Sequence, residues 1–320
     1  MRFKTKIITL SALAAGLCLS LVSGALYSYR GSESRSVRPL SAFLQKGNVS
    51  GLVFISGGRT VTLAARQPAR AGRSWTVLVD GQDYPAARNK AERFLELAGE
   101  ASVSPALTEN REKWPLFALG DGAEKRVVFS SPAGRTEILL GREEEAGRGQ
   151  YIRFEGSDAV YLMSQSFSYY AERDTAYWSE LRVFPAALNT QDIIAMKAEG
   201  RVQTPSGAAE VSWSLYRERK PEGILWLAEG DPERKLDQGK ADSLAASISQ
   251  INAKSFSPAT QEEAQALITL TAADRTRYEL HIGRPVSGGN YCQARVNGEA
   301  LPYAYILDSG LVEKITAPLE

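Results

Sequence analysis

The sequence predicts an α+β fold: an N-terminal transmembrane helix followed by two tandem repeats, each a mainly antiparallel sheet with one packed helix. Three observations lead to this prediction. Similar segments occur twice in the same order, short β-type runs surround each helical segment, and an uncharged apolar run lies near the N-terminus. Segments that recur in one order at a nearly constant offset indicate a duplicated supersecondary unit.

The duplication is visible in three pairs of segments. Residues 135–142 (RTEILLGR) resemble residues 276–284 (TRYELHIGR), and residues 149–156 (GQYIRFEG) resemble residues 289–298 (GNYCQARVNG). A helical stretch also precedes Val103-Ser-Pro-Ala, as another precedes Phe256-Ser-Pro-Ala. These pairs place the first repeat at residues 46–186 and the second at residues 187–320.

The first repeat begins with short β-type runs and continues through a helix into a meander. Its helix carries an apolar stripe at i, i+3, i+4 and i+7, formed by Ala91, Phe94, Leu95 and Ala98. Such a stripe faces a core. The expected strands are residues 52–55, 60–64, 75–79, 126–130, 137–140, 151–154 and 160–163.

The second repeat follows the same order. Its helix stripe consists of Ala241, Leu244, Ala245 and Ile248. The expected strands are residues 211–216, 224–228, 267–271, 278–282, 291–296 and 301–307, with Asn297-Gly298 as a hairpin turn.

One segment, residues 189–200, has two interpretations. Taken locally it is a capped helix, whereas alignment with residues 48–58 makes it the first strand of the second repeat. We favour the strand because repeated units share a topology.

The N-terminal run, residues 7–29, contains no charge and follows Arg2, Lys4 and Lys6. Its length exceeds the roughly 15 apolar residues of a signal peptide and reaches the roughly 20 of a spanning helix. We therefore expect residues 1–30 to be a membrane anchor, or alternatively a signal cleaved after Ala25, and residues 31–45 to be a tether. The expected localisation is the cytoplasmic (inner) membrane, single-pass, with the C-terminal part extracytoplasmic.

Composition and motifs exclude several function classes. The 320-residue chain has a net charge of +1, which gives no reason to expect a nucleic-acid partner. His281 is the single histidine, so most catalytic triads and zinc sites are ruled out. Cys292 lacks a neighbouring group that would activate its thiol, which predicts an inert core cysteine. We therefore expect no enzyme activity, no catalytic residue, no metal site and no cofactor.

The richest aromatic segment spans the end of the first repeat. It contains Tyr169, Tyr170, Tyr177 and Trp178, with Arg182 close behind. One interpretation is a packing seam between the repeats. The other is a surface that binds a partner or a ligand, since aromatic and arginine side chains dominate such surfaces.

Several strand and turn patterns resemble a known family. These are Trp75-Thr-Val-Leu-Val, Tyr84-Pro-Ala, Ile138-Leu-Leu-Gly-Arg, Gly149-Gln-Tyr-Ile-Arg, Ala159-Val-Tyr-Leu-Met and Tyr177-Trp-Ser-Glu-Leu-Arg182. The chain is similar to domain of unknown function 4340 (DUF4340). The second repeat lacks the Trp-Ser-Glu-Leu-Arg ending.

The resemblance implies a protein held by one N-terminal helix, with repeated α+β units outside the cytoplasmic membrane. It also implies an association with gliding-type ABC transporter components, and it supplies no catalytic residues. We therefore expect a non-catalytic, membrane-anchored extracytoplasmic accessory protein of an ABC-transporter or envelope complex. Its expected partners are the membrane, through residues 7–29, and a protein. The alternative is an extracytoplasmic glycan- or peptide-binding module.

Overall fold

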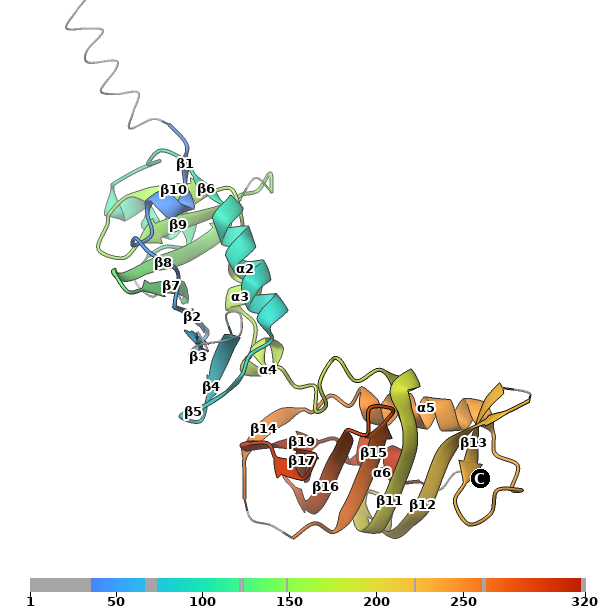
Figure 1. Ribbon diagram of the computed structural model, residues 1–320. Coiled ribbons are helices and arrows are strands. Elements are labelled where there is room, and N and C mark those ends of the chain that lie inside the picture. The colour runs from blue at the N-terminus through green and yellow to red at the C-terminus, as the bar shows by residue number, and fades with distance from the viewer. Residues whose placement is uncertain are drawn as a thin grey trace, which may run out of the picture. The chain divides into compact units, whose positions relative to one another are not determined.

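The computed structural model describes residues 36–66, 74–120, 122, 124–147, 149–221, 223–260 and 263–317. Contacts within the chain define two compact units. Unit 1 comprises Met1–Thr76 and Arg88–Asp174, and unit 2 comprises Val77–Ala87 and Thr175–Glu320. Each unit is built around one sheet (Figure 1).

The first sheet has ten strands in the order β1-β6-β10-β9-β8-β7-β2-β3-β4-β5. Neighbouring strands from β1 to β3 pair antiparallel. From Val77 onward, the β4–β5 hairpin groups with unit 2. The elements are β1 (Arg38–Pro39), η1 (Leu40–Ala42), β2 (Gly51–Ser56), β3 (Arg59–Arg66), β4 (Ser74–Val79), β5 (Gln82–Pro85), α2 (Arg88–Glu100), β6 (Ser102–Val103), η2 (Arg111–Phe117), β7 (Lys125–Ser131), β8 (Gly134–Glu143), β9 (Gln150–Phe154), β10 (Val160–Met163) and α3 (Ser168–Ala171).

Helix α2 supplies the core of unit 1 from one side of the sheet. Its buried residues are Ala91, Phe94 and Ala98, three members of the predicted stripe. The Phe94 ring lies 4.9 Å from the ring of Phe54 on β2 and 5.8 Å from that of Phe129 on β7. Removing a buried ring of this kind costs about 3–5 kcal/mol.

The second sheet has nine strands, with the path β13-β12-β11-β15-β16-β17-β19-β14 and β18 paired to β17. The elements of unit 2 after β5 are α4 (Thr175–Trp178), η3 (Thr190–Asp192), β11 (Ile193–Thr204), β12 (Gly207–Lys220), β13 (Gly223–Ala228), α5 (Gln238–Ser249), β14 (Ser255–Pro258), β15 (Ala266–Ala272), β16 (Arg277–Val286), β17 (Gly289–Val296), β18 (Glu299–Ala300), β19 (Tyr303–Leu307) and α6 (Ser309–Thr316).

Both sheets have the same order of corresponding strands. The order β6-β10-β9-β8-β7-β2-β3-β4 in the first sheet matches β14-β19-β17-β16-β15-β11-β12-β13 in the second sheet. The long helix follows the third of these strands along the chain in each unit. The sequence repeat therefore corresponds to two copies of one topology.

A glycine recurs at the start of β9 and β17 because no side chain fits there. A Cβ atom on Gly149 would lie 1.9 Å from the carbonyl oxygen of Met163. A Cβ atom on Gly289 would lie 1.8 Å from the carbonyl oxygen of Leu307, the corresponding residue in unit 2. The same close approach of two backbones thus explains both copies of the glycine.

The residue after each glycine is a fully buried amide, Gln150 in unit 1 and Asn290 in unit 2. Gln150 Oε1 accepts a hydrogen bond from Phe167 N at 2.9 Å, just before α3. Asn290 Oδ1 accepts one from Ser309 Oγ at 2.8 Å, at the start of α6. Each amide therefore ties its strand to the short helix that follows the last strand of its unit.

The ambiguous segment, residues 189–200, is a strand from Ile193 onward, which confirms the alignment of the repeats. Strand β11 runs over Ile193–Thr204 and pairs with both β12 and β15. The local helix signal has a source as well. Asn189 caps the three-residue helix η3, because its side-chain oxygen accepts a hydrogen bond from Gln191 N at 3.2 Å.

The predicted fold class, α+β, is wrong. The described residues are 48% strand and 20% helix, arranged around two large antiparallel sheets, so the fold is mostly β. In each unit, one long helix, of 13 residues (α2) or 12 residues (α5), and shorter helices accompany a sheet of ten or nine strands. The sequence pattern identified both helices, but the number of strands sets the class.

The predicted transmembrane helix, residues 7–29, lies outside the described residues. In the part of the chain that the structure describes, no helix is both long enough and apolar enough to cross a membrane. On this finding, the transmembrane helix and the single-pass inner-membrane localisation are not retained.

Candidate functional site

The two units differ most in one connection between corresponding strands. In unit 1, residues 104–124 join β6 to β7, whereas the far shorter residues 259–265 join β14 to β15 in unit 2. The longer connection folds into helix η2. Asn110 caps it by accepting a hydrogen bond from Glu112 N at 3.0 Å. Insertions carried by one repeat often form its binding face.

Trp114 anchors η2 on the sheet and is only 8% exposed. Its indole packs with Leu139 and Val160. The indole Nε1 donates a hydrogen bond to the carbonyl oxygen of Asp158 at 3.0 Å. The guanidinium carbon of Arg153 lies 3.9 Å from the ring centre, a cation–π contact worth about 0.5–2 kcal/mol. These contacts fix η2 in one position.

The residues after Trp114 form an exposed surface on this fixed base. Leu116 is 65% exposed, and the Phe117 ring packs 4.8 Å from the Tyr151 ring. Arg142 stacks 5.2 Å above the Tyr151 ring, and its Nε donates to the Leu116 carbonyl oxygen at 2.8 Å. We call Leu116, Phe117, Tyr151 and Arg142 the η2 surface.

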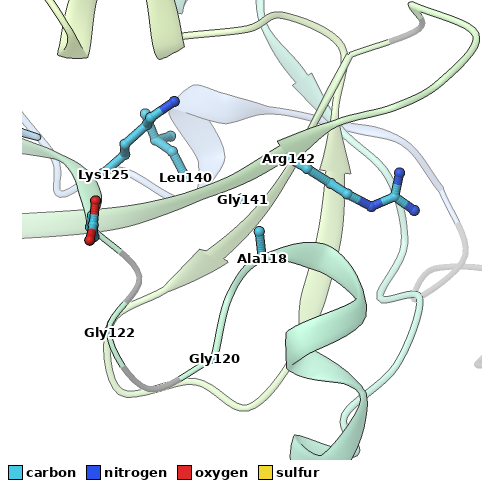
Figure 2. A pocket seen from close by; sticks show the side chains of 8 residues that line it. Ala118, Gly120, Gly122, Lys125, Leu140, Gly141 and Arg142 are labelled. Atoms are coloured by element: carbon cyan, nitrogen blue, oxygen red, sulfur yellow. The ribbon is translucent and has the colours of Figure 1, made fainter. Parts of the chain in front are cut away.

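A pocket of about 480 Å³ adjoins the η2 surface (Figure 2). The Ala118 side chain points toward Gly141 across it. Gly141 has no room for a side chain, since a Cβ atom there would lie 2.2 Å from the Phe117 carbonyl oxygen. The lining residues are Ala118, Gly120, Gly122, Glu124, Lys125, Leu140, Gly141 and Arg142.

The two cations at the pocket already have partners. Lys125 Nζ lies 2.5 Å from a carboxylate oxygen of Glu172, and Arg142 lies 3.2 Å from Glu145. The hydrogen bond and the charge of Lys125 lower the pKa of the Glu172 carboxyl. The lining therefore combines small residues with charged side chains, and both cations among them are ion-paired. Among the described residues, at this pocket or away from it, no group of three or more His, Cys, Asp or Glu side chains could hold a metal ion.

Comparison with known proteins identifies the family to which the chain belongs. A family model described as "Domain of unknown function (DUF4340)" matches residues 75–299. The chain belongs to the DUF4340 family. An uncharacterized protein of Treponema pallidum (strain Nichols) is 23% identical over 131 residues, covering 40% of this chain and 42% of that protein. The match thus spans less than half of the relative's length. No solved structure matches the chain significantly.

The aromatic residues predicted as a binding surface in this DUF4340 chain are divided between the two units. Tyr169 is 51% exposed and Tyr170 is half-buried, and both belong to unit 1. Tyr177 and Arg182 are half-buried in unit 2. Trp178 is fully buried, also in unit 2, so its inclusion in an exposed surface was wrong. The aromatic run in the sequence does not show which of its members face a core.

Cys292 and His281 both lie on strands, as the sequence predicts. Cys292 is fully buried in β17, and burial raises the pKa of its thiol, as expected for an inert core cysteine. His281 lies on β16 with its side chain 21% exposed, 3.2 Å from a carboxylate oxygen of Glu279.

Sequence reasoning missed the η2 surface. Its residues form no chemical motif, because leucine and phenylalanine are common in any core. The available signal was the spacing between repeated segments, since residues 104–124 have a much shorter counterpart in the second repeat. That counterpart, residues 259–265, also contains no aromatic residue.

Proposed function

We propose that this DUF4340 protein is a non-catalytic accessory protein that binds a partner protein through the η2 surface of unit 1. The observation that carries the proposal is the 65% exposed Leu116 on a base fixed by buried Trp114. A large apolar side chain held rigidly in solvent loses little conformational entropy when a partner covers it.

The composition of the η2 surface suits protein recognition. Hot spots at protein interfaces are rich in aromatic and arginine side chains around a buried apolar anchor. Here Leu116 is the apolar anchor, with Phe117, Tyr151 and Arg142 around it. The adjoining pocket of about 480 Å³ gives space for side chains of the partner.

The family resemblance guides the choice of partner. It implies a permease or another component of a gliding-type ABC transporter, or an envelope protein. A binding role without catalysis is supported by the ion-paired state of Lys125 and Arg142 at the pocket and by the single histidine of the chain.

Site-specific photo-crosslinking in cells tests the proposal. A photoreactive residue at Leu116 should give one dominant crosslinked protein, identified by mass spectrometry. The matched control is Ile224 on β13, which is 61% exposed but belongs to unit 2. Equal crosslinks from both positions, or none from Leu116, would contradict a partner site on η2.

A further inference from the structure

A second cavity, of about 560 Å³, lies in unit 1 beside the start of β8 and the turn between β9 and β10. Half-buried Phe43, Phe154 and Tyr161 form one wall, and Gln45, Arg135 and Glu155 are among the polar residues that line it. Ligand cavities in proteins typically measure about 300–1,000 Å³ and combine apolar walls with a few fixed polar groups. This cavity has both properties.

The aromatic wall is rigid. The Phe43 and Phe154 rings stack with centroids 4.9 Å apart and planes 7° apart. Tyr161 meets Phe154 edge-on at 5.6 Å, and the Arg38 guanidinium carbon lies 4.9 Å from the centre of the Phe43 ring. Three mutually packed rings keep their positions when a ligand binds.

The polar side of the cavity is organised by a buried carboxylate. Glu137 on β8 is 8% exposed, and it pairs with Arg126 at 3.2 Å and with Arg135. The Arg135 side chain is itself 64% exposed. Glu137 therefore fixes one end of the Arg135 guanidinium, which has further N–H groups to offer a ligand.

Guanidinium and carboxylate groups lie side by side at the cavity. Arg135, Glu137 and Glu155 line it, Arg126 pairs with Glu137, and Arg38 stacks on Phe43. Hydroxyl groups suit this arrangement, because each donates to a carboxylate and accepts from a guanidinium. From this chemistry we propose that the cavity binds a neutral saccharide. Its C–H face lies against Phe154 and Tyr161, and its hydroxyls bond to Glu155, Arg135 and Gln45.

The second repeat shows which parts of this site are special to unit 1. Unit 2 keeps the ion pair, since Arg277 lies 2.8 Å from Glu279, which is 7% exposed. By strand register, however, Ala294 occupies the place of Phe154. The next residue, Arg295, takes the place of Glu155. Tyr305 occupies the place of Tyr161. The ion pair and this tyrosine therefore belong to the shared fold, whereas Phe154 and the second carboxylate are additions in unit 1.

Saturation-transfer NMR on the 320-residue chain tests the proposal with cellobiose, maltose and chitobiose as neutral probes and glucuronic acid as an anionic one. We expect saturable binding of at least one neutral disaccharide. Arg135→Gln and Glu155→Gln should each weaken it about tenfold, the loss of one good hydrogen bond to a charged group. Arg277→Gln, the matched change in unit 2, should bind as the unmodified chain does.

Three outcomes would overturn the site. The first is no saturation by any neutral probe up to about 10 mM, a tenfold excess over a dissociation constant of about 1 mM. The second is binding of glucuronic acid alone, which would assign Arg135 to an anion. The third is an equal loss in Arg277→Gln. Because Glu155 is exposed, Glu155→Gln keeps the fold intact and separates binding from stability.

Discussion

The outer faces of the two sheets, opposite α2 in unit 1 and α5 in unit 2, show how one topology acquires two surfaces. In unit 1, Leu139 on β8 is 3% exposed beneath Trp114 of η2. The corresponding position on β16 is His281, whose side chain is 21% exposed and faces Glu279. Strand register pairs Leu139 with Arg153, and His281 with Gln293.

This difference shows that the loop between two strands, rather than the sheet itself, determines whether the outer face is apolar and buried or polar and exposed. A strand position covered by a long connection is apolar and buried, whereas the same position under a short connection is polar and wetted. The 104–124 segment therefore explains both the buried leucine of unit 1 and the exposed surface that η2 carries.

The test with the largest expected effect removes Trp114, the side chain that covers Leu139. Trp114→Ala should destabilise unit 1 by about 3–5 kcal/mol, because it leaves a cavity over Leu139 and removes the contact with Arg153. Urea titration, followed by hydrogen exchange in each unit, measures the loss. The matched change His281→Ala in unit 2 should cost about 1 kcal/mol or less. Similar losses from both variants would show that η2 is not a structural cover.

The second test uses the close backbone contact at a glycine that both units share. Gly149→Ala and Gly289→Ala should each cost about 3 kcal/mol, because the added methyl group overlaps a backbone carbonyl in both units. The same urea titrations check the prediction. Gly99→Ala is the control, since nothing lies within 4 Å of that position, and it should stabilise α2 by about 0.5–1 kcal/mol. A neutral result at either strand glycine would break the equivalence of the two units.

The smallest test concerns the ion pair beside the pocket. Glu172 has a pKa below its ordinary value of 4.5, chiefly because of its hydrogen bond with Lys125. A lowered carboxyl pKa contributes stability above the ordinary value, and this contribution is lost as the pH falls through the folded-state pKa. Glu172 is exposed, so Lys125→Met should cost at most a few tenths of a kcal/mol at neutral pH.

An NMR titration of the Glu172 carboxyl carbon measures the pKa directly. In Lys125→Met, the midpoint should rise toward 4.5. An unchanged midpoint would mean that Lys125 does not interact with this carboxylate in solution.

Much of the topology was visible in the sequence because strands and helices leave periodic patterns. The stripe of Ala91, Phe94 and Ala98 predicted α2, and the repeated glycines marked equivalent backbone contacts. Alignment of the repeats also assigned β11 correctly where the local signal indicated a helix. The fold class was wrong because strand number depends on pairings between distant segments, which a local pattern does not contain.

The candidate site was less accessible to sequence reasoning for a related reason. Trp178 and Tyr169 are neighbours in an aromatic segment, but one is fully buried and the other is 51% exposed. Leu116 belongs to no motif. Its exposure depends on how Trp114 packs η2 against the sheet. Burial at both places follows from tertiary packing, and residue type alone does not reveal it.

The most direct test of partner binding by unit 1 is the ratio of photo-crosslink yields at Leu116 and Ile224 in living cells. The proposed function predicts one dominant protein product from Leu116 and only background from Ile224. Equal yields at the two positions, or a dominant product from Ile224 alone, would contradict it.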